Sequence, residues 1–142
     1  MLGVIQVERT SELAADADRV WAHATSMAGV NAELQQWLRM TTPRGEFAFH
    51  SWLLLGGVLP FDRHALGFEA MEPAQRWFHE RSSSWVQREW VHRRSIEALG
   101  SGCRLTDRVT CVPRVAMAEA VVGRIVAAVF EHRHRRLRAM FG

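Results

Sequence analysis

The fold is decided by the last stretch of the chain, residues 115–141, which reads VAMAEAVVGRIVAAVFEHRHRRLRAMF. Pro113 precedes this stretch and no proline interrupts it, so a helix can run through without a break. Apolar residues recur every three or four positions, the spacing that places side chains on one face of a helix. They are Val122, Val126, Phe130, Leu137 and Phe141. The pattern predicts a long, largely buried helix over Val115–Phe141.

The end of this predicted helix is rich in basic side chains, namely His132, Arg133, His134, Arg135, Arg136 and Arg138. Cations are favourable near the negative end of the helix dipole. We interpret the cluster as a solvated helix end, and an arm that binds nucleic acid is the alternative. His132 and His134 are two positions apart and point in different directions on a helix, so they make a poor metal pair.

Length and composition indicate one globular domain that is large enough to bury a core. The chain has 142 residues, of which 48% are hydrophobic and 23% are charged. The formal net charge is +3, and all 18 basic residues other than histidine are arginines. Because this charge is scattered along the chain, we expect no nucleic-acid partner.

The sequence predicts neither a signal peptide nor stable membrane insertion. Acidic and arginine residues interrupt the N-terminal apolar residues, and the longest segment without them, Phe47–Phe61, is too short to span a bilayer. Cys103 and Cys111 would be about 27 Å apart on one strand at ~3.4 Å per residue, too far for a disulfide. We therefore expect a reduced, cytoplasmic protein.

The N-terminal part predicts one strand followed by two short helices. Leu2–Leu13 alternates in the manner of a strand, and Asp16 is suited to cap the helix that follows. Gly29 is expected to end that helix, and Asn31 to cap the second one. The inward residues of the second helix would be Leu34, Trp37 and Leu38.

The middle of the chain begins with a predicted loop over Thr41–Glu46. Phe47–Pro60 is ambiguous, since its apolar run with two adjacent glycines fits a strand that bends or a short helix that enters a turn. We favour the bending strand. Alternation with a period of two starts at Phe61, and Glu72 and Pro73 mark the next turn.

Three further strands follow, joined by short turns. They are predicted over Arg76–Ser82, Val86–Ala98 and 103–111, with turns at Ser82–Ser84 and Leu99–Gly102. Short turns make neighbouring strands antiparallel, and a large twisted sheet curls and needs a cover on its apolar face. The prediction is an α+β fold in which a curved antiparallel β-sheet wraps around the long C-terminal helix, with two short helices after the first strand.

The inward face of the last strands carries charged residues among its apolar ones. A four-residue turn at Leu99–Gly102 places Arg94 opposite Asp107 and His92 diagonal to Asp107. Glu80 is expected opposite Trp90. Buried charges need partners, so these side chains form either a self-satisfied polar network or a polar floor that orients the carbonyl or hydroxyl of a ligand.

General acid–base chemistry by His92, positioned by Asp107, is a narrower form of the second interpretation. These two residues are the catalytic candidates. The ligand-binding candidates are Trp52, Phe68, Phe78, Glu80, Trp90, His92, Arg94, Asp107, Val126 and Phe130. No phosphate-binding loop, nucleophile elbow or Cys-x-x-Cys motif is present in the sequence, and we expect neither a cofactor nor a metal.

Several motifs resemble those of one superfamily. They are Trp90-Val91-His92, Thr106-Asp107-Arg108-Val109, the ending Phe130–Leu137 and the segment Leu55–Pro60. With the order of elements, they resemble the bacterial branch of the START-like or polyketide cyclase/dehydrase superfamily, also called SRPBCC, helix-grip or Bet v 1-like. The resemblance implies a cavity between sheet and helix that takes lipids, sterols or polyketides, and in a minority of members a cyclisation or dehydration.

The expected function is therefore the binding or carrying of a hydrophobic small molecule, lipid or polyketide-like, by a single START-like domain over residues 1–142. One alternative is an enzyme of the polyketide cyclase/aromatase type that uses His92 and Asp107 as its acid–base pair. Another is a non-catalytic interaction module, such as a homodimer, whose cavity is filled by its own tryptophans. Of these, a protein without catalytic activity is favoured.

Overall fold

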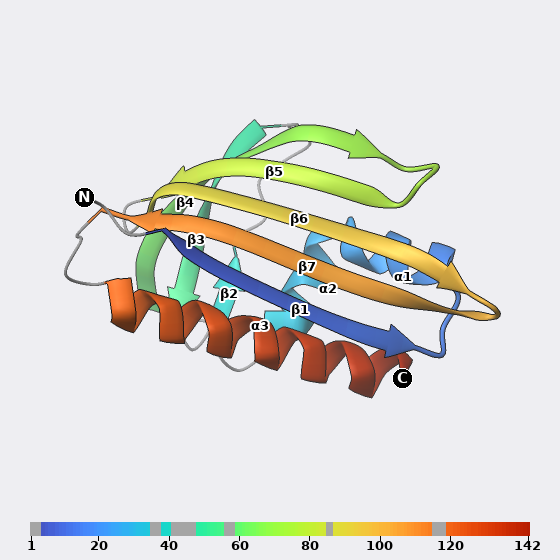
Figure 1. Ribbon diagram of the computed structural model, residues 1–142. Helices are drawn as coiled ribbons and strands as arrows, with labels where there is room; N and C mark the ends of the chain where they lie inside the picture. The colour runs from blue at the N-terminus through green and yellow to red at the C-terminus, as the bar shows by residue number, and fades with distance from the viewer. Residues whose placement is uncertain (1–3, 35–37, 41–47, 56–58, 85–86, 115–118) are drawn as a thin grey trace.

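The computed structural model describes residues 4–34, 38–40, 48–55, 59–84, 87–114 and 119–142, with the backbone alone at 27, 38–40, 48–55, 59–69 and 84. These residues form one antiparallel sheet and three helices (Figure 1). The strands are β1 (Ile5–Leu13), β2 (Leu38–Met40), β3 (Ala48–Leu55), β4 (Leu59–Glu72), β5 (Trp77–Ser84), β6 (Gln87–Leu99) and β7 (Gly102–Pro113). The helices are α1 (Ala17–Ala24), α2 (Met27–Leu34) and α3 (Glu119–Phe141).

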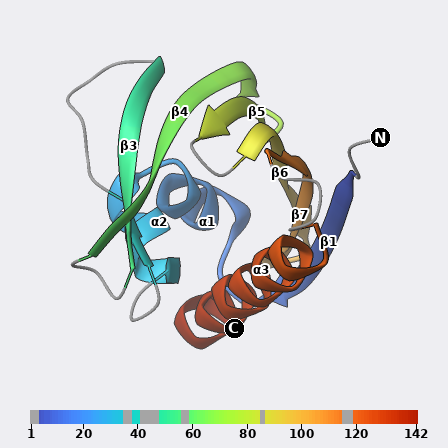
Figure 2. The same cartoon turned by 90° about the vertical axis from the view of Figure 1, so that its left-hand side faces the viewer.

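The seven strands lie in the order β1-β7-β6-β5-β4-β3-β2, so each strand from β2 to β6 pairs with the next strand in sequence. Strand β1 pairs with β7 and forms one edge of the sheet, and β2 forms the other. Figure 2 shows that the sheet is bent, with β3 and β4 standing opposite β1 and β7, and that α3 lies along the open side. This is the predicted helix-grip arrangement, which the structure confirms.

The boundaries of the two short helices partly differ from prediction. Asp16 caps α1 as predicted, and its Oδ1 accepts a hydrogen bond from the backbone amide three residues later at 3.0 Å. Gly29 and Asn31 both lie inside α2, so their predicted roles are wrong. The Oγ of Ser26 accepts from the Gly29 amide at 2.9 Å and supplies the cap instead. A Cβ at Gly29 would lie 1.9 Å from the His23 carbonyl oxygen, so glycine permits this close contact between the helices.

The centre of the chain is a pair of strands. Ala48–Leu55 forms β3, and its pairing with β4 shifts register between Leu53 and Leu54. The strand interpretation is thus correct for residues 48–55. The two glycines and the predicted loop Thr41–Glu46 lie outside the described residues. Leu38 begins the short strand β2 and does not continue a helix, because α2 ends at Leu34. Trp37 also lies outside the described residues.

The core consists of two apolar clusters. The first packs α1 against one end of the sheet and contains Leu13, Ala17, Val20, Ala24, Ile96, Cys103, Leu105 and Leu137. The second packs the first half of α3 against β1 and β7 and contains Ile5, Val109, Cys111, Val122, Val126 and Phe130. Alternate residues of β7 face inward, and Asp107 stands between Leu105 and Val109 in that series. A charged side chain therefore lies in the middle of the core.

The two cysteines contribute packing to this core. Cys103 and Cys111 are both buried and free, which agrees with the predicted absence of a bond between them. Burial raises the pKa of both thiols, that of Cys111 to about 11. Neither thiol is activated as a nucleophile at neutral pH.

In the described part of the chain, no helix is long and apolar enough to cross a membrane.

Candidate functional site

A layer of polar side chains separates the two apolar clusters. Its members come from β1, α2, β6, β7 and α3, and all of them are buried. They are Ser11, Glu33, His92, Arg94, Asp107, Arg133 and His134, and we call them the polar layer. Strands β1 and β7 and helix α3 place apolar residues on both sides of it, so the layer crosses the core of the molecule.

Arg94 is the centre of the polar layer. Its Nε and Nη2 donate to Oδ1 and Oδ2 of Asp107 at 2.7 and 2.8 Å. Its Nη1 and Nη2 donate to Oε2 and Oε1 of Glu33 at 2.9 and 2.7 Å. The fully buried guanidinium thus binds two carboxylates, each through two hydrogen bonds, and ties β6 to both β7 and α2.

The geometry keeps all three of these groups charged. Burial alone would raise the pKa of Glu33, but the attraction of Arg94 and Arg133 and the hydrogen bond from His23 hold it well below its ordinary value. Burial opposes ionisation of Asp107 in the same way, and Arg94 with two histidines outweighs it, so that pKa is also lowered. The pKa of Arg94 is raised, because its carboxylate partners outweigh the effect of burial.

Two histidines contact the same carboxylate. The Nε2 atoms of His92 and His134 lie 2.7 and 2.8 Å from Oδ1 and Oδ2 of Asp107. An ionised carboxylate only accepts hydrogen bonds, so we assign a proton to both Nε2 atoms. The Nδ1 of His134 lies 2.7 Å from the Oγ of Ser11, which accepts from Arg138 at 3.0 Å and donates its own hydrogen to the ring. Both nitrogens of His134 are therefore satisfied in its neutral form.

Glu33 connects the polar layer to the helices. Besides Arg94, it accepts from Nε of Arg133 at 3.0 Å and pairs with Nε2 of His23 at 2.9 Å. Arg136 adds a hydrogen bond from its Nε to the backbone carbonyl of Ala32 at 3.1 Å. Through these contacts, α1 and α2 are fixed to the last turns of α3.

Two aromatic side chains contact the ring of His92. The rings of Phe78 and Phe130 meet the His92 ring edge-on, with centroids 5.5 and 5.2 Å away. Trp90 stacks on Phe130 with a centroid distance of 6.2 Å. We call Phe78, Trp90 and Phe130 the aromatic group. On the side away from Asp107, the Nδ1 of His92 lies 4.0 Å from Oε1 of Glu80, which is beyond hydrogen-bond distance.

The strand register agrees with prediction at the centre of the site and differs at one side. Arg94 is paired with Asp107, and His92 reaches that residue diagonally, both as predicted. Glu80 was expected opposite Trp90 but is paired with His92. The reason is that β5 continues to Ser84, so the predicted turn at Ser82–Ser84 is wrong. Because the register differs from the expected one by two residues, Glu80 has a different partner on β6 and still lies on the same face of the sheet.

The polar layer contains residues that the sequence analysis did not assign to a site. Arg133 and His134 were interpreted as part of a solvated helix end, which is wrong for these two because both are buried. The signal was the spacing of Phe130, Arg133 and Leu137, which puts the arginine on the buried face. Glu33 was missed because its burial depends on Arg94, which is distant in sequence.

The structure places the other predicted ligand residues on three elements. Val126 and Phe130 are buried on α3 and belong to the second apolar cluster. Trp52 lies on β3 opposite Arg63, and Phe68 lies on β4 opposite Glu80, with the backbone alone described at both positions.

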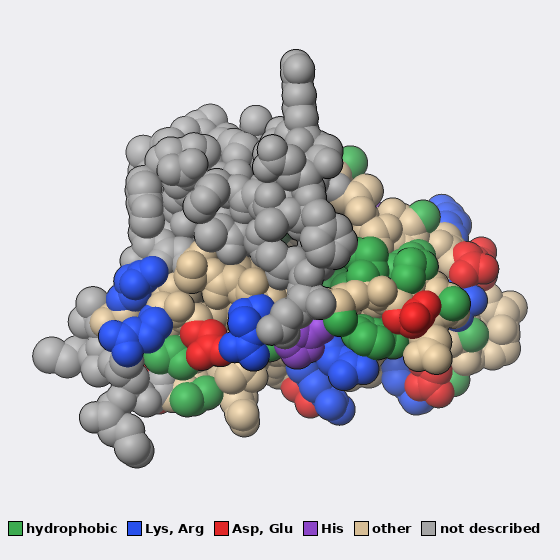
Figure 3. Space-filling model, turned by 90° about the horizontal axis from the view of Figure 1, so that it is seen from above, with side chains coloured by type: hydrophobic (Ala, Val, Ile, Leu, Met, Phe, Trp, Pro, Cys, Tyr) green, Lys and Arg blue, Asp and Glu red, His purple; other side chains and the backbone are tan. Residues whose placement is uncertain are grey.

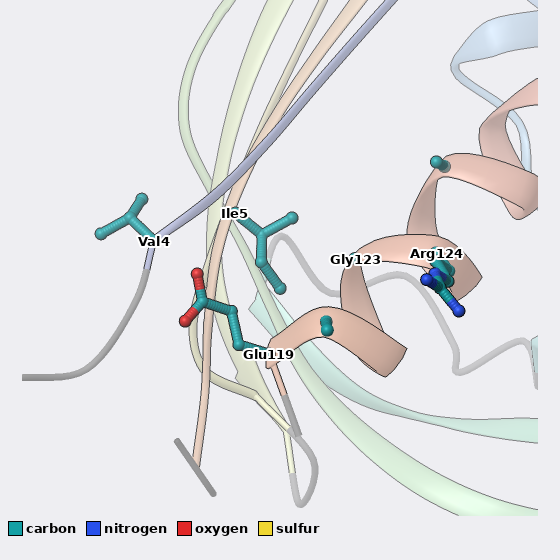
Figure 4. Close-up of a pocket in the computed structure, with 7 residues that line it drawn as sticks. Val4, Ile5, Glu119, Gly123 and Arg124 are labelled. Atoms are coloured by element: carbon teal, nitrogen blue, oxygen red, sulfur yellow. The ribbon is translucent and has the colours of Figure 1, made fainter. Parts of the chain in front are cut away.

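An open hollow lies elsewhere, between the start of β1 and the first turns of α3 (Figure 4). It is lined by Val4, Ile5, Glu119, Ala120, Gly123, Arg124 and Ala127. None of the predicted ligand residues whose side chains are described lines it.

On the described part of the face in Figure 3, hydrophobic side chains lie beside arginine, acidic and histidine side chains. The described residues contain no group of three or more His, Cys, Asp or Glu arranged to hold a metal ion.

Solved structures share this fold. An aromatase/cyclase named Zhui from Streptomyces sp. R1128 is similar with a TM-score of 0.79 at 15% identity, over 97% of this chain and 93% of that one. A START superfamily protein from Mycobacterium smegmatis is similar with a TM-score of 0.76 at 14% identity, over 98% and 97%. Ara h 8.0201 is similar with a TM-score of 0.62 at 12% identity, over 95% and 98%. The protein thus has a START-like, SRPBCC-type fold, as its motifs predicted.

The sequence itself matches a family without an assigned activity. No curated protein matches the chain. A family model described as "Domain of unknown function (DUF8410)" matches residues 11–141. Because the match spans most of the chain, the protein belongs to the DUF8410 family.

Proposed function

We propose that this protein binds or carries a hydrophobic small molecule, lipid or polyketide-like, between the curved sheet and α3. Residues 1–142 would act as a single ligand-binding domain, with the aromatic group and Val126 as apolar contacts. Trp52 and Phe68 would supply contacts from β3 and β4. Glu80, His92, Arg94 and Asp107 would form or support the polar end of the site.

One observation carries this proposal: His92 is fixed by Asp107 at 2.7 Å while its ring makes edge-on contacts with the rings of Phe78 and Phe130. A small number of positioned polar atoms within an apolar lining is the usual composition of a site for a small ligand. The fold gives separate support, since structures of this shape include a START superfamily protein and an aromatase/cyclase.

Native mass spectrometry of the purified protein tests the proposal. We expect the chain to carry an added organic mass, either acquired during expression or after incubation with palmitic acid or 1-naphthol. Activation in the gas phase should release this mass as a small molecule. A spectrum that shows only the mass of the bare chain under all three conditions would contradict the proposal.

The contact between His92 and Asp107 also favours a second candidate, an enzyme of the polyketide cyclase/aromatase type. The carboxylate fixes the orientation of the imidazole, and a histidine held in this way is suited to general acid–base work. Two of the similar structures are of proteins named as aromatase/cyclases. Turnover of a poly-β-ketone mimic that is lost in His92→Phe would favour this candidate, and binding without turnover favours the carrier.

A further inference from the structure

The two nitrogens of His92 are in different situations. Its Nε2 donates to Asp107, whose oxygens also accept from Arg94 and His134. Within the described part of the chain, its Nδ1 makes no hydrogen bond, and the nearest acidic atom is Oε1 of Glu80 at 4.0 Å. His134 differs, because Ser11 satisfies its Nδ1.

The carboxylate determines what this free nitrogen can do. Asp107 accepts hydrogen bonds only, so the neutral His92 ring carries its proton on Nε2 and presents a lone pair at Nδ1. The facing atom on Glu80 is a carboxylate oxygen, which in its ionised form also only accepts. The lone pair at Nδ1 is best satisfied by a hydrogen-bond donor that approaches this nitrogen.

We propose that the ligand of this site is an apolar molecule with a hydroxyl group, and that this hydroxyl donates a hydrogen bond to Nδ1 of His92. The inference rests on the proposed function and narrows it to a chemical class. Phenols, enols and alcohols have the required donor. Ethers and ketones of the same shape lack it, and would place a second acceptor against Nδ1.

A pair of probes tests the donor directly. 1-Naphthol and 1-methoxynaphthalene have the same ring system, and both oxygens accept, but only the naphthol donates. We expect the wild-type protein to bind 1-naphthol about tenfold more tightly at pH 7, the effect of one hydrogen bond in a buried site. In His92→Phe, which keeps an aromatic ring and loses the acceptor, the two affinities should come within about twofold of each other. His79 is the matched control, because it lies on the face of β5 opposite to Glu80. His79→Phe should keep the wild-type preference for 1-naphthol.

The outcomes separate this inference from the proposed function. If the wild-type protein binds both probes equally, or if the preference persists in His92→Phe, the hydroxyl assignment is wrong while apolar binding stands. If neither probe binds, both proposals fail. A measurement on the wild-type protein covers the case in which His92→Phe does not fold. Nitrogen-15 NMR should show the His92 Nδ1 signal shift on addition of 1-naphthol and stay in place with 1-methoxynaphthalene, and an unmoved signal with naphthol would overturn the inference.

Discussion

Replacement of Arg94 by methionine should destabilise the protein by about 5 kcal/mol, the upper end of the range for removal of one partner from a buried ion pair. Methionine has a similar length and can fill the space, so the loss would come from the charges rather than from a cavity. Glu33 and Asp107 would each lose two hydrogen bonds and their main counterion while they remain buried. Chemical denaturation followed by fluorescence measures the change as a fall in the midpoint.

The neighbouring residue provides a matched control. Arg93 lies on the opposite face of β6, is exposed, and stacks over Trp77 at 4.9 Å. Arg93→Met removes the same charge from the same strand and should cost no more than about 1 kcal/mol, the scale of an exposed cation–π contact. Equal losses in the two variants would show that the buried ion pairs of Arg94 do not have the role we assign to them.

The second large effect is expected from Glu33→Gln and concerns pH. The folded protein lowers the pKa of Glu33 and Asp107, so at acidic pH the unfolded chain binds more protons than the folded one. The stability that these carboxylates contribute is complete above their unfolded pKa of about 4 and is lost as the pH falls through the lowered folded values. Glu33→Gln should cost about 3–5 kcal/mol at pH 7, because Arg94 and Arg133 lose a buried counterion.

The pH profile distinguishes this cause from a packing defect. A glutamine does not titrate, so below pH 4 the stability of Glu33→Gln should fall less steeply than that of the wild type, by up to about 1.4 kcal/mol per pH unit for one proton. Glu97→Gln removes an exposed carboxylate on β6 and should change stability by less than about 1 kcal/mol with an unchanged profile. Parallel profiles for Glu33→Gln and the wild type would refute the ionised state that we assign to Glu33.

The fold was largely predictable because its signals are local. Alternation along β4, β6 and β7 and the apolar spacing of α3 each depend on residues close in sequence. The turn at Leu99–Gly102 fixed the register that pairs Arg94 with Asp107. The turn after β5 was misplaced, since three consecutive serines allow more than one position, and Glu80 was therefore assigned the wrong partner.

The polar layer was only half predictable, for a different reason. Its strand residues follow from alternation. Glu33 and His134 join it through tertiary contacts, Glu33 with Arg94 at 61 positions away in the sequence and His134 with Asp107 at 27 positions away. Charged residues near the end of a helix are usually solvated, and the α3 cluster was interpreted in that way. Arg133 shows that position on the apolar stripe outweighs this tendency when a buried carboxylate is available.

The central claim is that an apolar molecule binds against the concave face of the sheet and the inner side of α3. Fluorescence titration with 1-aminoanthracene tests it in the wild type and in two variants of α3, Val126→Phe and Val121→Phe. Val126 is 6% exposed and lies one turn from Phe130, whereas Val121 is 60% exposed. We predict micromolar binding to the wild type, unchanged affinity in Val121→Phe, and at least about tenfold weaker binding in a folded Val126→Phe. No binding to the wild type, or equal affinity in the two variants, would contradict the account.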